Sequence, residues 1–280
     1  MTNLVRRTIT GAFIVIFVLG GLWLHPVSFF LIVAIMIAGT QNEYYTMVRG
    51  TGIKPQTVTG IITGFLLYFI STMVATGWLP RGAFLILIPV VSVIMIIELF
   101  RKVERPFDSL AHTFFSILYT AVPFSMFPFT AFNHTGLEPL IQMKGIEFSP
   151  GIPVGFFLLL WTNDTGAYLI GSLIGKHRLF ERISPKKSWE GFFGGLILTL
   201  IVARLISGWL GVADATGWLV IAVIISLAGT AGDLIESMLK RSLGLKDSGT
   251  IMPGHGGFLD RFDSVVVSFP LVYLYIALLG

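Results

Sequence analysis

Two stretches of the sequence combine acids, bases and glycines in an order that suits phosphate chemistry. The first, Gly256-Gly257-Phe258-Leu259-Asp260-Arg261-Phe262-Asp263, places two aspartates three residues apart at the start of an apolar run, so both can face one cation. Its glycines allow a ligand to approach the backbone closely. The second, Ser184-Pro185-Lys186-Lys187-Ser188, offers lysines and hydroxyls that can hold a phosphate. The alternative for this second stretch is an ordinary basic loop of a membrane protein.

Acids that can hold a metal, beside bases that can hold phosphates, indicate phosphoryl or nucleotidyl transfer. The transition state of such a reaction is stabilised mainly by positioning and by charge. The sequence contains no cysteine and five scattered histidines, which excludes thiol chemistry and cysteine zinc sites. A metal site must therefore be built mainly from oxygen atoms. Oxygen ligands favour Mg²⁺, and a second cation is left open.

Several charged residues fall inside long apolar stretches, where each costs about 2.5–3.5 kcal/mol. Asp164 shares one helical face with Tyr168, Gly171 and Gly175, and such a face can approach another helix or line a wet cavity. A second face carries Asp233, Glu236, Ser237 and Lys240.

Three further charges have simpler explanations. Glu98 lies beside Arg101 and Lys102 near a helix end and is expected to be an interfacial charge with a nearby partner. Arg204 is expected to extend outward along the lipid, with an internal ion pair as the alternative. Glu43 either joins helices through a polar contact or forms a wall of the site.

The composition predicts a membrane protein. Hydrophobic residues make up 54% of the 280 residues and charged residues 12%, about half of the usual charged share of a soluble domain. A helix needs about 20 apolar residues to cross a bilayer, so we expect an all-α bundle of about nine transmembrane helices. Their expected ranges are 8–24, 27–48, 57–78, 82–100, 110–131, 152–174, 190–211, 216–236 and 263–279.

The distribution of basic residues predicts which side each loop faces. If the N-terminus is cytoplasmic, all but three of the 19 basic residues fall in the expected cytoplasmic segments. The exceptions, in expected outer segments or inside a helix, are Arg81, Lys144 and Arg204. Aromatic residues at the expected outer helix ends agree with this orientation; they are Trp23, Trp78, Trp209 and Trp218.

We expect one continuous membrane domain over residues 1–280. Residues 1–150 are less distinctive, and residues 151–280 form the catalytic half, with loops 175–190 and 237–262 in the cytoplasm. A secondary transporter that uses Asp164 and Asp233 in an ion pathway is a second hypothesis. Transporters often contain internal repeats, and the sequence has no obvious repeat, which favours an enzyme.

Four blocks together resemble a known family. They are Ser237-Met238-Leu239-Lys240-Arg241, Lys246-Asp247-Ser248-Gly249, Pro253-Gly254-His255-Gly256-Gly257 and Asp260-Arg261-Phe262-Asp263. This pattern resembles the signature of phosphatidate cytidylyltransferases, also called CDP-diacylglycerol synthases. The blocks 163–168 and 184–191 are similar to further blocks of that family.

The resemblance implies a Mg²⁺-dependent reaction of CTP with phosphatidate in a membrane, with no nucleic-acid partner. It implies a metal site at Asp233 and Asp260; Asp263 and Asp164 are additional candidate ligands. CTP-dependent transfer to another lipid is the alternative reaction, and a homodimer is left open. A prokaryotic inner membrane is the expected location. The expected catalytic residues are Asp233, Asp260, Lys240, Arg241 and His255, and the expected substrate-binding residues are Ser184, Lys186, Lys187, Ser188, Lys246, Asp247, Gly256, Gly257 and Arg261.

Overall fold

The computed structural model describes residues 3–132, 141–143, 146–210, 213–245, 248–249 and 257–279. Seven residues named in the sequence analysis lie outside these ranges, and their roles stay predictions. They are Lys144, Lys246, Asp247, Pro253, Gly254, His255 and Gly256.

Helices dominate the described residues, and each of the nine stretches expected to be helical contains a helix. The long helices are α1 (Asn3–Leu24), α2 (Pro26–Arg49), α3 (Thr57–Ala75), α4 (Leu87–Phe100), α5 (Pro106–Ser116), α8 (Gly151–Ile174), α9 (Trp189–Leu210), α10 (Ala215–Ser242) and α11 (Asp263–Leu279). Shorter helical segments are η1 (Arg81–Ile86), η2 (Ile117–Ala121), α6 (Val122–Ser125), α7 (Pro128–Ala131) and η3 (Leu259–Arg261). The expected all-α class is therefore confirmed in its main part.

Two short antiparallel hairpins were not expected. One joins β1 (Ile141–Met143) to β2 (Ile146–Phe148), and the other joins β3 (Arg178–Phe180) to β4 (Ser184–Ser188). The second hairpin contains the Lys186-Lys187 pair, so the pairing of β3 with β4 determines where these two lysines lie.

The chain is a multi-pass membrane protein, but the expected nine spans are not confirmed. Within the described residues, six helical segments are long and apolar enough to cross a bilayer: 26–49, 57–75, 81–100, 106–131, 189–210 and 215–242. The apolar parts of α1 and α11 are shorter, at Gly11–Leu24 and Asp263–Leu278. Helix α8 is long, but Asn163 and Asp164 interrupt its apolar run. These two polar residues make α8 less apolar, so its composition indicates a membrane span less clearly.

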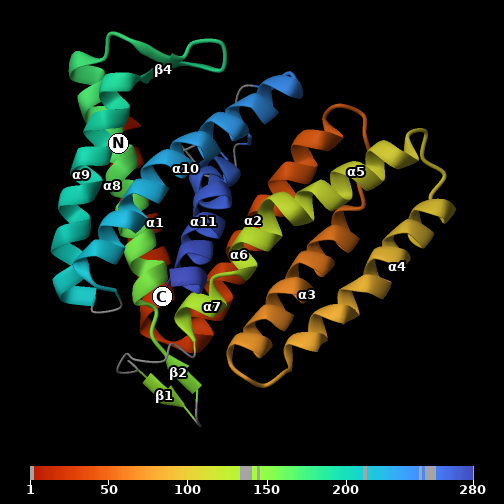
Figure 1. Ribbon diagram of the computed structural model, residues 1–280. Helices are drawn as coiled ribbons and strands as arrows, with labels where there is room; N and C mark the ends of the chain where they lie inside the picture. The colour runs from red at the N-terminus through yellow and green to blue at the C-terminus, as the bar shows by residue number, and fades with distance from the viewer. Residues whose placement is uncertain are drawn as a thin grey trace.

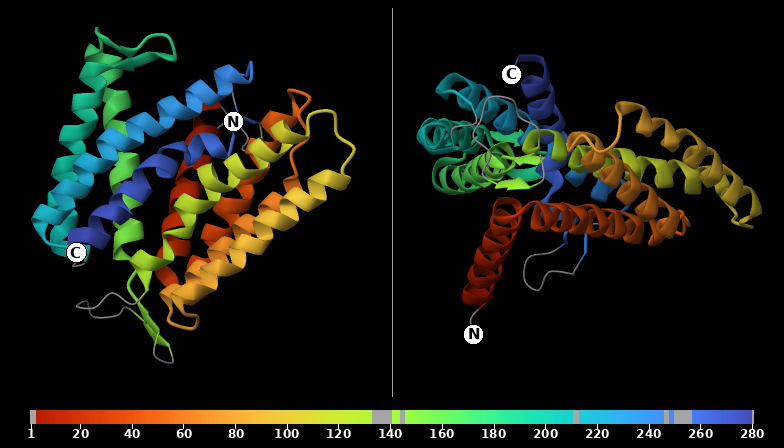
Figure 2. Two further views of the ribbon diagram at one scale, coloured as in Figure 1. Left: turned by 45° about the vertical axis from the view of Figure 1, so that its right-hand side comes forward. Right: turned by 90° about the horizontal axis from the view of Figure 1, so that it is seen from below.

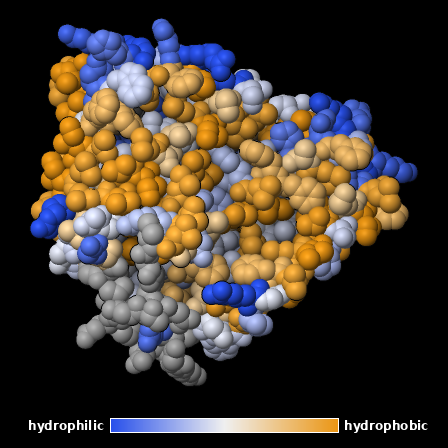
Figure 3. Space-filling view, in the orientation of Figure 1, coloured by the Kyte–Doolittle hydropathy of each residue, from blue (hydrophilic) through white to orange (hydrophobic). Residues whose placement is uncertain are grey.

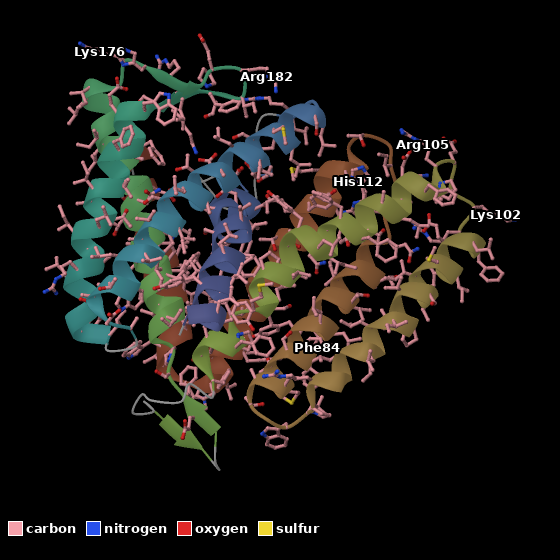
Figure 4. The ribbon with its side chains drawn as sticks, viewed as in Figure 1. Phe84, Lys102, Arg105, His112, Lys176 and Arg182 are labelled. Atoms are coloured by element: carbon pink, nitrogen blue, oxygen red, sulfur yellow. The ribbon has the colours of Figure 1, made fainter. Side chains whose placement is uncertain are left out.

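The helices run up and down, so the loops gather at two ends of the bundle. The turns after α2 and α4, the β3–β4 hairpin and the end of α10 lie toward the upper and right-hand ends, and the β1–β2 hairpin lies at the lower end (Figure 1). Figure 4 places Lys176 and Arg182 on the upper hairpin, and Lys102 and Arg105 at the α4–α5 turn. An orange apolar surface separates the blue ends on the face shown in Figure 3.

Helix starts are set by local hydrogen bonds. Asp214 accepts a 2.6 Å hydrogen bond from the Gly217 N–H at the start of α10. Ser188 accepts a 3.1 Å bond from the Gly191 N–H at the start of α9. Such caps satisfy backbone groups that the helix itself leaves free.

Glycines hold α8 and α9 side by side, as Figure 2 shows. A Cβ added to Gly166 would lie 3.1 Å from the Gly195 Cα, and one added to Gly191 would lie 3.1 Å from the Gly171 Cα. We call these four residues the glycine seam. The expected close approach to another helix is found at Gly171, whereas Asp164 and Tyr168, expected on the same face, are exposed.

Two further expectations can be compared with the structure. Glu98 is buried and accepts a 2.7 Å bond from Arg101, as expected, and a 2.6 Å bond from Gln56. Trp218 was expected in an aromatic belt, but it is fully buried. The reason is local: Gly155 leaves space for the indole, so Trp218 packs into the protein core.

Candidate active site

The polar stripe expected on α10 becomes part of a cluster of alternating charges. The Lys240 Nζ lies 2.5 Å from Glu236 Oε2 and 2.6 Å from Asp260 Oδ1. The Glu236 side chain is buried, and the Lys240 side chain is only 14% exposed. A buried ammonium between two carboxylates is stabilised by both, whereas removal of one partner leaves an uncompensated buried charge.

Asp260 is held by both of its oxygen atoms. Oδ1 accepts from Lys240, and Oδ2 accepts a 2.9 Å hydrogen bond from the Gly257 N–H. Burial by itself raises the pKa of this carboxyl, but hydrogen bonds, with those from the Lys240 ammonium and the Gly257 N–H among them, lower the pKa to about 2. Asp260 is therefore ionised at neutral pH.

A second ion pair joins the upper hairpin to α10. The Lys187 Nζ, on β4, lies 2.6 Å from Asp233 Oδ2. The Lys187 side chain is 25% exposed and that of Asp233 is 38% exposed, so a ligand arriving from water can reach this pair. The structure thus brings together two residues that are 46 positions apart in the sequence.

The remaining expected metal ligands surround Asp233. The carboxylates of Asp233 and Asp164 lie close enough to Asp263 to repel it, and Asp164 itself is exposed on α8. Within the described part of the chain, no group of three His, Asp or Glu side chains is placed to hold one metal ion. The donor chemistry suits a hard cation, but the present spacing does not form a closed ligand set.

The other expected binding residues occupy several positions. Lys186 and Arg261 are exposed, and Ser184 is half-buried on β4 opposite Phe180. Arg241 donates a 3.3 Å hydrogen bond to the Leu245 carbonyl just beyond α10. Ser188 is buried and caps α9. Its role as a phosphate ligand stays a prediction, and the structure adds a structural role.

Three residues outside the expected catalytic, substrate-binding and metal sets belong to this region; one of them, Glu43, was expected either to join helices or to form a wall of the site. Glu236 pairs with Lys240, and the one-turn spacing between them could have indicated this. The Tyr119 hydroxyl lies near the charges of Asp263 and Glu236 and has no hydrogen-bond partner within the described ranges. Glu43 accepts a hydrogen bond from the Leu259 N–H. Tyr119 and Glu43 come from the first half of the chain, where the sequence carries no comparable motif.

Two hollows adjoin different parts of residues 151–280. One, of about 670 Å³, lies at the base of the upper hairpin between Lys176, Arg178 and Trp189. The other, of about 550 Å³, is an apolar groove between α10 and α11. Its lining includes Ala231, two residues before Asp233, and Val267, one helical turn after Asp263.

The fold and the charge cluster together define a multi-pass helical membrane protein with a polar site at one end of its bundle. A family model for the cytidylyltransferase family matches residues 5–279, so the chain belongs to that family.

Individual relatives agree with the family. The chain is 36% identical over 223 residues to a phosphatidate cytidylyltransferase of Staphylococcus haemolyticus, covering 79% of this chain and 80% of that protein. It is 52% identical over 118 residues to the phosphatidate cytidylyltransferase of Staphylococcus saprophyticus, and 50% identical over 118 residues to that of Staphylococcus aureus strain COL. Each of these shorter matches covers 41% of this chain and 45% of the relative.

Proposed function

We propose that this chain transfers the cytidylyl group of CTP to phosphatidate, producing CDP-diacylglycerol and pyrophosphate for phospholipid synthesis. The observation that carries the proposal is the cluster in which Lys187 touches Asp233 and Lys240 touches Asp260, the two aspartates at which the family resemblance implies a metal site. Family membership and relatives named phosphatidate cytidylyltransferase support the choice of reaction.

The chemistry requires little of the protein beyond position and charge. A phosphate oxygen of phosphatidate attacks the α-phosphorus of CTP, a new P–O bond forms, and the bond to the β-phosphate oxygen breaks. Pyrophosphate leaves with that electron pair. The attacking phosphate is already anionic near neutral pH, so a strong general base is not required. Stabilisation of the growing negative charge is the main task.

The two lysines are suited to that task because their present partners can be exchanged. When a triphosphate enters, Lys187 and Lys240 can move from carboxylate oxygens to phosphate oxygens nearby. Asp233 and Asp260 then lose their ion-pair partners and become available to a cation. The exchange keeps each buried charge compensated throughout, which avoids the cost of an isolated charge.

Asp233 and Asp260 would hold Mg²⁺, and Asp263 and Asp164 are further ligands within the same region. The oxygen-only donor set fits this ion. When bound, the cation neutralises negative charge on the phosphates. The phosphate groups would be contacted by Lys186 and Arg261. Lys246 and His255 are given the same role on the sequence pattern alone.

The lipid substrate needs a route from the bilayer. We place its acyl chains in the apolar groove between α10 and α11, because its lining includes Ala231 and Val267, which lie within about one helical turn of Asp233 and Asp263 along their helices. All nine helical stretches would cross the bilayer, with the upper ends in Figure 1 facing the cytoplasm. The charge distribution in the sequence supports this orientation.

One experiment tests the reaction. Purified protein in detergent is given phosphatidate, Mg²⁺ and each nucleoside triphosphate in turn, and released pyrophosphate is measured. We expect release with CTP or dCTP and little with ATP or GTP. Equal rates with all bases would overturn the cytidylyl assignment. Greater activity with a polyprenyl or ether-lipid phosphate would change the lipid, and nucleotide-independent flux into sealed vesicles would favour a transporter.

A further inference from the structure

Glu43 connects the first half of the chain to the loop that carries Asp260. It lies on α2 and is 1% exposed. Its Oε2 accepts a hydrogen bond from the Leu259 N–H, at the start of η3. Leu259 directly precedes Asp260, so this bond fixes the backbone next to a proposed catalytic residue.

The loop fits closely around this carboxylate. A Cβ added to Gly249 or to Gly257 would overlap Glu43 Oε1. The buried Ser248 hydroxyl lies beside the same carboxylate. One turn earlier on α2, a Cβ added to Gly39 would lie 2.7 Å from the Phe258 ring. Helix α2 therefore contacts the loop at two successive turns, through Gly39 and Glu43.

We propose that Glu43 is a positioning residue, which holds the backbone at Gly249, Gly257 and Leu259 so that Asp260 meets Lys240. This inference rests on the proposed function for its kinetic consequence. Its structural part, a carboxylate that clasps the loop, can be tested without any activity.

The surroundings of Glu43 differ from those of a carboxylate that serves only helix packing. The buried Glu98 is neutralised by an arginine 2.7 Å away. Glu43 instead uses a backbone N–H, and the nearby carboxylate of Asp260 opposes its charge. A buried carboxylate is costly unless it is compensated. Here the loop itself compensates the buried Glu43 carboxylate. The position of the loop and the stability of that carboxylate therefore depend on each other.

The first test compares Glu43→Gln with Glu98→Gln, a matched change at a buried glutamate away from the cluster. We expect Glu43→Gln to lower kcat about tenfold, since the amide oxygen can still accept from the Leu259 N–H but the hydrogen bond is no longer strengthened by a negative charge. The unfolding midpoint of Glu43→Gln should fall no further than that of Glu98→Gln. The Glu98→Gln variant should keep the parent kcat and the parent KM for CTP. Equal kinetics in the two folded variants would overturn the positioning role.

A second test uses the close fit. Gly249→Ala should reduce kcat because its methyl group overlaps the Glu43 carboxylate. Glu43→Asp withdraws the carboxylate by one methylene, so Gly249→Ala with Glu43→Asp should be more active than Gly249→Ala alone. Strictly additive losses would contradict direct contact and overturn the proposal.

A third measurement needs no catalysis and separates this inference from the proposed function. The chain has no cysteine, so a Ser248→Cys variant carries one thiol at a buried position. Adding Glu43→Ala should speed its reaction with a water-soluble maleimide about tenfold, because a local restraint worth one such hydrogen bond is removed. Unchanged labelling would overturn the contact between Glu43 and the loop, even if the parent enzyme is active. Faster labelling in a protein whose parent is inactive would support that contact and would reject the proposed cytidylyl transfer.

Discussion

At the scale of single residues, the cluster is built from mutual compensation. Lys240 lies between Glu236 and Asp260, and Lys187 touches Asp233. Each of these side chains is stabilised by another that carries the opposite charge. A single substitution therefore changes two things, the group removed and the partner left behind.

Asp260→Asn tests the most constrained of these acids. The substitution keeps the size of the side chain and removes its charge, so Lys240 loses one partner and the expected cation loses a ligand. Metal-assisted charge stabilisation is worth several kcal/mol, so turnover should fall about a hundredfold or more. The measurement is the initial rate of pyrophosphate release over a series of Mg²⁺ concentrations.

The control is Asp108→Asn. Asp108 pairs with Arg105 at 2.5 Å, and its side chain is 43% exposed at the α4–α5 turn. This variant should behave like the parent. We would abandon the metal role if folded Asp260→Asn protein kept near-normal turnover and an unchanged Mg²⁺ requirement.

The pKa of Asp260 gives a prediction about acid stability. Burial raises this pKa, but the hydrogen bonds to Asp260, with those from Lys240 and the Gly257 N–H among them, together lower it to about 2, below the ordinary value of 3.8. A lowered folded-state pKa stabilises the fold above the unfolded pKa, and this contribution disappears as pH falls. The difference in unfolding midpoint between parent and Asp260→Asn should be constant down to about pH 4 and shrink between about pH 4 and pH 2. A difference that already shrinks near neutral pH would contradict the assignment.

At the scale of elements, α10 has two functional faces. One carries Asp233, Glu236 and Lys240, and the other lines the apolar groove with Leu227, Ala228 and Ala231. Under the proposed function, a single helix would therefore contact both the charged head of the lipid and its apolar chains. The sequence revealed the polar face through its spacing. It did not reveal the groove, because apolar residues that line a groove and apolar residues that face lipid have the same composition.

Ala228→Trp tests the use of the groove. An indole at this position would fill part of the groove between α10 and α11, and the KM for phosphatidate should rise several-fold while the KM for CTP stays unchanged. The matched control is Ile197→Trp, on an exposed apolar face of α9. If both variants have the parent KM for the lipid, the acyl chains do not lie in this groove.

At the scale of the whole molecule, the sequence predicted the helical class and the approximate position of each of the nine long helices, but not the short helix η3 within the expected loop 237–262. Hydrophobic runs are long, and the turns between them contain charges and prolines that end a helix. The count of spans was less secure, because α8 contains Asn163 and Asp164 and looks too polar by composition. The contact from Glu43 to Leu259 could not be predicted, since it joins residues 216 positions apart through backbone geometry.

Orientation in the membrane can be tested with single cysteines, because the chain has none. Gly82→Cys lies after α3, where an added Cβ meets open space, and Lys102→Cys lies at the exposed α4–α5 turn. An impermeant thiol reagent added to intact cells should label the cysteine at position 82 and spare the one at position 102. The reverse pattern would place the charge cluster on the outer side of the membrane.

The glycine seam has a consequence for genetics. Gly166, Gly171, Gly191 and Gly195 carry no charge and touch no proposed substrate, yet they let α8 and α9 lie close enough for the hairpin between them to bring Lys187 to Asp233. A single added methyl group at the seam would push the helices apart by a fraction of an ångström, an effect that heat would enlarge. A screen for temperature-sensitive alleles should therefore recover glycine-to-alanine changes here, in cells that grow normally when cool and stop growing when warm.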